Sequence, residues 1–230
     1  MQELLKENIK TVFSDNILSV HGLNNGDYDK KALFYDKIMS NTLYNLLAWG
    51  NHPKNYSKFA EQSYLSSNEG YVVDIGCGSL CFTSQIYNKY LDRSLILTDL
   101  SSQMLKIAKS RLSENFSRNT SLLRADALNL PFKDNSVNTI LSFGFLHIVT
   151  EPIKLITELN RVLKMKGDLH ISCLCTDRNI SKNYLSFLQK RELVHNSLNS
   201  SEILHLINSN GFHARIKVIG GMAYIDAIKK

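Results

Sequence analysis

Short apolar runs alternate with helical segments from Tyr71 to the end of the chain, and this alternation limits the fold more than any other feature. Strands that alternate with helices build a parallel sheet with helices on both faces. A Gly-Gly pair near the end predicts a hairpin, which adds an antiparallel element. The expected strands are 71–75, 94–98, 121–124, 137–142, 168–175 and a hairpin over 213–229, and the expected helices are 80–90, 101–112, 152–163, 182–189 and 201–209.

The first 69 residues have a different pattern, without this alternation. Apolar residues at helical spacing predict helices at 2–13, 32–49 and 56–65, and a Gly/Asn-rich break at 21–26 separates the first two. The chain has only three prolines and no low-complexity linker. We therefore expect a helical cap over residues 1–69, followed by an α/β domain over residues 70–230.

The chain of 230 residues, 43% of them hydrophobic and 21% charged, is long enough for one α/β domain with a substantial core. No apolar run approaches the ~20 residues that a membrane-spanning helix needs. The N-terminus carries acidic residues and has no continuous apolar stretch, so it does not resemble a signal peptide. These features predict a cytoplasmic protein without a membrane span.

The net charge of +6 is concentrated in residues 151–230, which carry 12 basic and 7 acidic side chains. These residues contain no dense Lys/Arg run, so a diffuse basic surface is favoured over a face that binds nucleic acid. Four cysteines occur without a C-x-x-C spacing, which favours small buried thiols in a reducing compartment over metal ligands. They are Cys77, Cys81, Cys173 and Cys175, and we expect no metal site.

The first strand ends in Asp74, and Gly76 and Gly78 follow it. Two glycines one residue apart allow a sharp turn and a close approach of the backbone to a ligand. A carboxylate directly before this turn would repel the pyrophosphate of NAD or FAD, and Cys81 stands where the dinucleotide fingerprint has its third small residue. S-adenosylmethionine (SAM) has no phosphate and carries a sulfonium and an ammonium group, so Asp74 favours SAM over a dinucleotide.

Two further acids, Asp99 and Asp126, follow the next two predicted strands. Asp99 is placed to accept hydrogen bonds from ribose hydroxyls, or else to lie in the first turn of the following helix. Asp126 is placed to accept a hydrogen bond from an adenine amino group, or else to stabilise a turn. Ligands bind beyond the carboxyl ends of parallel strands, so three acids at three such ends favour one shared ligand.

Four segments carry a family resemblance: Val72-Val-Asp-Ile-Gly-Cys-Gly78, Leu97-Thr-Asp-Leu-Ser101, Arg124-Ala-Asp-Ala-Leu-Asn-Leu-Pro-Phe132 and Leu159-Asn-Arg-Val-Leu-Lys-Met-Lys-Gly167. In order and spacing they resemble the class I SAM-dependent methyltransferases, in the small-molecule branch that includes the ubiquinone/menaquinone-biosynthesis type. The resemblance covers roughly residues 70–175. It implies a Rossmann-like sheet of seven mostly parallel strands with an antiparallel last strand, and SAM lying across the carboxyl ends of the strands.

The resemblance also implies which residues bind the cofactor. The loop around Cys77 would hold the methionine part, Asp99 the ribose and Asp126 the adenine edge, with Tyr28 and Tyr35 of the cap at the methionine end. The full set is Tyr28, Tyr35, Asp74, Gly76, Cys77, Gly78, Asp99, Leu100, Met104, Asp126, Ala127, Phe143 and Gly144. The sequence departs from the family at Leu80, where a third glycine is usual, and at Met165-Lys-Gly167, where Pro-Gly-Gly is usual.

Methyl transfer from a sulfonium is an in-line displacement, in which positioning is the main task of the enzyme. A hydroxyl acceptor would benefit from a general base, and His147, just past the fourth strand, is the candidate. A structural role for His147 is the more common alternative. Tyr44, Trp49 and Tyr56 form an aromatic group that either packs in the core or lines an acceptor pocket.

The leading interpretation is a methyltransferase that acts on a small-molecule acceptor. A homodimer is a further prediction. Three alternatives remain: an RNA methyltransferase, a SAM-binding protein without catalytic activity, and an NAD-dependent dehydrogenase. The RNA acceptor is disfavoured because the chain has no dense basic patch and no Asn-Pro-Pro-Tyr-type motif. The dehydrogenase is disfavoured by Asp74 and Cys81.

Overall fold

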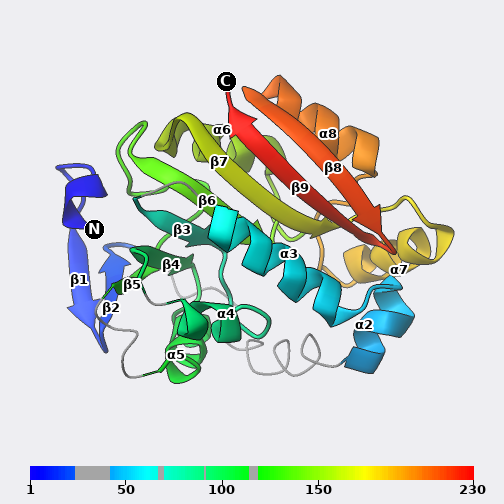
Figure 1. The fold of residues 1–230 in the computed structure, drawn as a ribbon, viewed down its shortest axis with the longest axis horizontal. Coiled ribbons are helices and arrows are strands. Elements are labelled where there is room, and N and C mark those ends of the chain that lie inside the picture. The colour runs from blue at the N-terminus through cyan, green and yellow to red at the C-terminus, as the bar shows by residue number, and fades with distance from the viewer. Residues whose placement is uncertain (24–41, 67–69, 91, 114–118) are drawn as a thin grey trace.

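A computed structural model describes residues 1–23, 42–66, 70–90, 92–113 and 119–230. A single nine-stranded sheet, in the order β1-β2-β5-β4-β3-β6-β7-β9-β8, runs through these residues (Figure 1). Its strands are β1 (Thr11–Ser14), β2 (Ile17–Val20), β3 (Val72–Ile75), β4 (Leu95–Asp99), β5 (Thr120–Arg124), β6 (Val137–Phe143), β7 (Leu163–Leu174), β8 (Phe212–Ile219) and β9 (Met222–Lys229).

The seven strands from β3 to β9 confirm the predicted fold class. Strand β3 pairs in parallel with β4 and β6, and the parallel pairing continues from β4 to β5 and from β6 to β7. The last strand, β9, is antiparallel to both of its neighbours, β7 and β8. The chain order therefore reverses at β3, and this switch point is where ligands bind in open α/β sheets.

The predicted helix over residues 2–13 is wrong. A short 3-10 helix, η1 (Gln2–Leu4), is followed by the hairpin β1–β2, whose turn residues Asp15 and Asn16 have φ angles of 55° and 63°. Aspartate and asparagine adopt this left-handed conformation more readily than most residues, and a two-residue turn of this kind selects a hairpin. Strand β2 then pairs in parallel with β5, so these first residues extend the sheet and do not form a helix.

Helices cover both faces of the central sheet. On one face α3 (Pro53–Ser66), α4 (Ser84–Lys89) and α5 (Ser102–Ser110) bury a cluster that includes Tyr64, Tyr87 and Leu105. On the other face α6 (Pro152–Val162) and α8 (Ser200–Ser209) bury a larger cluster that includes Leu159 and Ile207. This three-layer arrangement confirms the helices that were predicted on both sides of the sheet.

The predicted helix over residues 32–49 is described only from Thr42, as α2 (Thr42–Trp49). This helix lies beside α7 (Asn179–Lys190) at one end of the sheet (Figure 1). The turn of the predicted β8–β9 hairpin packs against α2, because the amide of Gly221 donates to the carbonyl of Trp49 at 2.6 Å. A Cβ atom on Gly220 would clash with the backbone of Gly50. This close contact fixes the end of α2 against the sheet.

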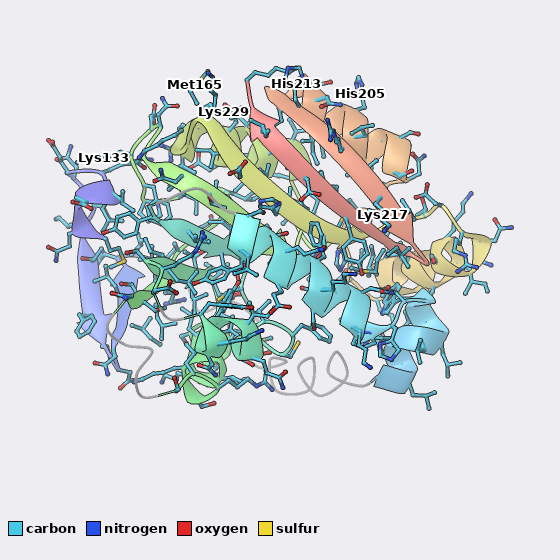
Figure 2. All side chains as sticks on the ribbon, viewed as in Figure 1. Lys133, Met165, His205, His213, Lys217 and Lys229 are labelled. Atoms are coloured by element: carbon cyan, nitrogen blue, oxygen red, sulfur yellow. The ribbon has the colours of Figure 1, made fainter. Side chains whose placement is uncertain are left out.

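The opposite end of β9 is held by a buried lysine. Lys229, labelled in Figure 2, donates from Nζ to Asn135 Oδ1 at 2.8 Å and to the carbonyls of Asn160 and Leu163 at 2.5 and 2.8 Å. Burial lowers the pKa of its ammonium group, but three acceptors in place of water keep the charge paired. Lys229 therefore ties β9 to the start of β7.

Candidate functional site

A cavity of about 360 Å³ lies at the carboxyl ends of β3, β4, β5 and β6. Every predicted cofactor-binding residue that the structure describes lines it, and His147 does so as well. Tyr28 and Tyr35 lie outside the described residues. The lining residues predicted from sequence are Asp74, Gly76, Cys77, Gly78, Asp99, Leu100, Met104, Asp126, Ala127, Phe143 and Gly144.

The loop after β3 turns sharply through its two glycines, as predicted. Gly76 and Gly78 have φ angles of +68° and +56°, in the left-handed region that favours glycine. A Cβ atom on Gly76 would lie 2.5 Å from Cγ of Phe145, whereas one on Gly78 would meet no atom within 4 Å. Gly76 is thus required for packing, and Gly78 leaves the loop backbone open on the side where a ligand would approach.

Leu80 occupies the position where the third glycine of the loop is usual. Its φ angle is +59°, so a leucine holds the left-handed backbone conformation at this position. This conformation costs roughly 1–2 kcal/mol for a residue with a Cβ atom. The side chain is only 2% exposed and packs among the residues under α4 and α5, and this burial offsets the cost.

Asp74 is a buried carboxyl group in the cavity wall. Its side chain is almost fully buried, Oδ2 accepts a hydrogen bond from Tyr87 Oη at 2.8 Å, and Oδ1 has no partner. Burial, together with the charge of Asp99, raises the pKa of Asp74 to about 7, against the smaller opposing effect of Tyr87. A buried acceptor without a partner is costly, and a cationic group in the cavity would supply one.

Tyr87 was not identified from the sequence. It lies on α4, 13 residues after Asp74, and its ring packs on Tyr64 with centroids 5.2 Å apart. No local motif connects it to the glycine loop, because the contact arises only when α4 packs on the sheet. Tyr87 orients the Asp74 carboxylate, so that the unpaired oxygen is Oδ1.

Asp99 joins the two loops that form the middle of the cavity. Its Oδ2 accepts from the amide of Gly78 at 2.9 Å, and its Oδ1 accepts from the amide of Ser101 at 2.8 Å. The N-cap of α5 is Ser101, whose side chain accepts from the amide of Met104 at 3.1 Å, so Asp99 is not the capping residue. These contacts hold the Asp99 carboxylate in the cavity wall, where its oxygens can accept from hydroxyl groups of a ligand.

Asp126 combines a turn role with a place in the cavity wall. Its Oδ1 accepts from the amide of Leu128 at 2.9 Å, which is the turn contact considered in the sequence analysis. The same side chain lines the cavity next to Ala127. The turn therefore fixes the orientation of the carboxylate without excluding a ligand.

His147 is buried beside the cavity and is held as a neutral ring. Its Nδ1 accepts from the amide of Leu174 at 3.3 Å, which puts the ring proton on Nε2. Burial lowers the pKa of His147 to about 3. Its carbonyl accepts from the amides of His195 and Asn196, so the residue connects the loop after β6 to the end of β7. This geometry supports the structural alternative for His147.

The far wall of the cavity is aromatic and includes residues that the sequence analysis did not select. Trp49 and Tyr56 line it, while Tyr44 packs behind them, with its hydroxyl 2.7 Å from that of Tyr184. Trp49 and Tyr184 have ring centroids 4.8 Å apart. Among the described residues the cavity wall contains no lysine or arginine. The lining residues that the sequence did not suggest include Asn45, Asn51, Leu174, His195 and Met222.

The cysteines do not form a reactive or metal-binding group in the part of the chain that the structure describes. None of the four forms a disulfide. Cys173 and Cys175 are buried as predicted, whereas Cys77 and Cys81 are only partly buried, contrary to the prediction. Burial and the nearby carboxylates of Asp74 and Asp99 raise the pKa of the Cys77 thiol, which therefore stays protonated. No cluster of three or more His, Cys, Asp or Glu side chains placed to hold a metal ion is found in the described ranges.

One known protein family matches part of this chain. The family described as a methyltransferase domain matches residues 73–171, which include the glycine loop, Asp99, Asp126 and β6. This range agrees with the roughly 70–175 over which the sequence resemblance was found. No helix among the described residues has the length and hydrophobicity that crossing a bilayer would require.

Related sequences include enzymes of quinone biosynthesis. The chain is 30% identical over 142 residues to a demethylmenaquinone methyltransferase of Lactiplantibacillus plantarum, with 60% of this chain and 57% of the relative covered. It is 32% identical over 159 residues to a ubiquinone/menaquinone biosynthesis C-methyltransferase of Rickettsia typhi, with 64% and 62% covered. The chain thus spans less than two thirds of the length of these curated relatives.

Solved structures share the fold at low sequence identity. A SAM-dependent methyltransferase from Thermotoga maritima superposes with a TM-score of 0.64 at 18% identity, covering 88% of this chain and 98% of the other. Geranyl diphosphate C-methyltransferase from Streptomyces coelicolor, solved with S-adenosyl-L-homocysteine, superposes with a TM-score of 0.62 at 15% identity, covering 77% and 76%. These likenesses establish the class I methyltransferase fold.

Proposed function

We propose, because this chain carries a methyltransferase domain of class I fold, that it transfers a methyl group from SAM to a small-molecule acceptor. The observation that carries the proposal is the unpaired, buried Oδ1 of Asp74 in the wall of the cavity. SAM has two cationic groups and no phosphate, so it fits an acidic cavity that a dinucleotide does not fit. The relatives in quinone biosynthesis support a small organic acceptor.

Each acid has a distinct task in this proposal. Asp74 pairs with the positive charge of the methionine part, and this pairing holds its carboxylate ionised. Asp99 accepts from the ribose hydroxyls while its backbone contacts keep the glycine loop in place. Asp126 accepts from the adenine edge, with its orientation fixed by the turn to Leu128. When bound, SAM supplies an activated methyl group that needs no further activation by the protein.

The rest of the cavity positions the acceptor and excludes water. Trp49, Tyr56 and Phe143 supply an apolar wall next to the glycine loop. Positioning alone accounts for a large part of the barrier of a bimolecular displacement, and a dry cavity prevents solvation of the attacking atom. We assign His147 a positioning role and not that of a general base, because the lone pair at Nδ1 already accepts from the Leu174 amide.

The division into a cap over residues 1–69 and a domain over residues 70–230 stays a proposal, but part of the predicted cap belongs to the sheet. Helices α2 and α3 supply cap residues to the cavity, including Trp49 and Tyr56, while residues 11–20 belong to the sheet. Contacts of Tyr28 and Tyr35 with the methionine end, a cytoplasmic location and a homodimer remain predictions. Four cysteines without a disulfide support a reducing compartment.

Calorimetric titration tests the cofactor assignment. The protein should release heat with SAM and none with NAD, and Asp99→Ala should weaken SAM binding at least tenfold, since it removes a hydrogen-bonding carboxylate. Lys229→Met, far from the cavity, is a control for general loss of stability. Folded wild-type protein that gives no heat with SAM would contradict the proposal, as would NAD binding of comparable strength.

A further inference from the structure

Helix α2 buries Trp49 and Asn45 but also exposes three leucines to the surface. Leu43 and Leu47 are 64% and 72% exposed, whereas Asn45 is buried and Trp49 lines the cavity. A helix on the surface of a protein in water normally turns charged or polar residues toward the solvent. The leucines of α2 therefore indicate an apolar environment outside the domain at this position.

Helix α7, which lies against α2 (Figure 1), buries Leu185 and Leu188 in the core but also exposes apolar side chains. Ile180 and Phe187 are 69% and 46% exposed, while Ser181 is buried. The two helices are joined by the hydrogen bond between the hydroxyls of Tyr44 and Tyr184. We call the exposed apolar side chains Leu43, Leu46, Leu47, Ile180 and Phe187 the α2–α7 face.

Cations border this face. Arg178, Lys182, Lys190 and Arg191 on and beside α7 are all exposed, whereas the only acids within residues 177–193 are Asp177, which bonds to Ser200, and Glu192. The guanidinium of Arg191 lies 4.5 Å from the ring centroid of Phe187, at the apolar face itself. Exposed apolar side chains on a helix that also carries exposed Lys and Arg are typical of helices that lie in the interface of an anionic membrane.

The α2–α7 face is also continuous with the cavity. The ring of Phe187 stacks on Tyr184 with centroids 6.1 Å apart, and Tyr184 contacts Trp49, which lines the cavity. A row of aromatic rings therefore leads from the exposed face to the wall that would hold the acceptor. An apolar acceptor in a lipid layer would meet this row before it meets bulk water.

We propose that the α2–α7 face docks this protein on an anionic lipid surface, with the leucines and Phe187 in the interface and the cations at the head groups. The further step, that the apolar acceptor enters the cavity from this side, rests on the proposed function. Docking itself does not, because it can be measured without SAM and without methyl transfer.

Co-sedimentation with vesicles tests the docking. The protein should bind vesicles of phosphatidylcholine containing phosphatidylglycerol, and should bind vesicles of phosphatidylcholine alone much more weakly. The double variant Leu47→Glu/Phe187→Glu should abolish binding. The matched control is Met165→Glu, since Met165 is 62% exposed on β7 at the opposite end of the sheet (Figure 2) and its change should leave binding intact.

The cations give a second measure. Replacing Lys182 and Lys190 by Ala should weaken binding to the anionic vesicles by roughly fivefold for each charge, as about 1 kcal/mol per cation near the surface implies, and added salt should weaken wild-type binding. Circular dichroism and SAM titration check that the variants fold. Equal binding to both vesicle types, or binding that survives Leu47→Glu/Phe187→Glu, would overturn the proposal. A dimer that this double variant dissociates, without vesicle binding by wild type, would assign the face to a second copy and overturn it as well.

Discussion

At the scale of single residues, Asp74 shows how a binding site conflicts with stability. The folded, ligand-free protein holds its carboxyl with a pKa near 7, whereas the unfolded chain has the ordinary value of 3.8. The unfolded state therefore loses its proton first as the pH rises. The contribution of Asp74 to stability falls between about pH 4 and pH 7 and stays constant above that range.

Asp74→Asn should remove this loss of folding stability. At pH 8 the ligand-free variant should unfold at a higher urea concentration than wild type. Its free energy of unfolding should exceed that of wild type by up to about 4 kcal/mol at pH 8, and the difference should shrink to near zero at pH 4. The same variant should bind SAM more weakly, because the charge that pairs with the cation is gone. Urea unfolding at both pH values measures the effect, and a variant less stable than wild type at pH 8 would refute the assigned cost.

His147 gives a second prediction at this scale. Asn places its Oδ1 near the position of imidazole Nδ1, so His147→Asn should keep the acceptor for the Leu174 amide. If the residue acts only by positioning, the variant should keep kcat within tenfold of wild type and leave its pH profile unchanged, while His147→Ala should lose more. A loss of 10² to 10⁴ in His147→Asn would instead identify a general base.

Leu80 gives a third prediction, in which two effects of different size compete. Replacing a buried leucine by a small residue costs about 2–5 kcal/mol, and release of the left-handed strain returns only about 1–2 kcal/mol. Leu80→Gly and Leu80→Ala should therefore both destabilise the protein. Glycine should be the less harmful of the two, contrary to the usual order, and thermal unfolding that finds alanine clearly better would contradict the strain at this φ angle.

At the scale of elements, the contact between the β8–β9 turn and α2 controls the acceptor wall. Gly220→Ala would push a Cβ atom into the Gly50 carbonyl, so α2 has to move and carry Trp49 with it. We expect a loss of about 3 kcal/mol in unfolding free energy, weaker binding of the acceptor, and nearly unchanged binding of SAM. Gly22→Ala is the control, since Gly22 has a φ angle of +83° but no atom near its Cβ position, and it should cost only the strain of about 1–2 kcal/mol. Similar losses in both variants would show that the close contact does not matter.

Periodicity predicted the elements well where local sequence dominates and failed where pairing partners decide. The β8–β9 hairpin followed from Gly220-Gly221, and the helix predicted over 201–209 agrees with α8 to within one residue. The structure adds a capping box of Asn199 and Glu202 at its start. Residues 2–13 were assigned to a helix, although residues 11–13 belong to β1, because the pairing of the β1–β2 hairpin with β5 is remote in sequence. The two-residue turn Asp15-Asn16 was the available signal for the hairpin.

At the scale of the whole molecule, the sheet brings together residues that the sequence placed at separate strand ends. The predicted cofactor residues that the structure describes line one cavity, because parallel strands end at the same edge. Tyr87 and Met222 were not predicted as site residues. Tyr87 acts on the cavity through Asp74 and Met222 lines it, and both positions depend on packing between elements and not on a motif. The proposed acceptor end is the part least visible in sequence, because it is built from α2, α3 and the β8–β9 hairpin.

The central claim, transfer of a methyl group from SAM to a small molecule, is tested most directly with methyl-labelled SAM and a metabolite extract. The proposed function predicts label in an organic-soluble product, resistant to ribonuclease, formed by wild type and lost with Asp99→Ala. Label found only in ribonuclease-sensitive material would contradict the small-molecule acceptor. No transfer at all, from protein that binds SAM, would identify a SAM-binding protein and not an enzyme.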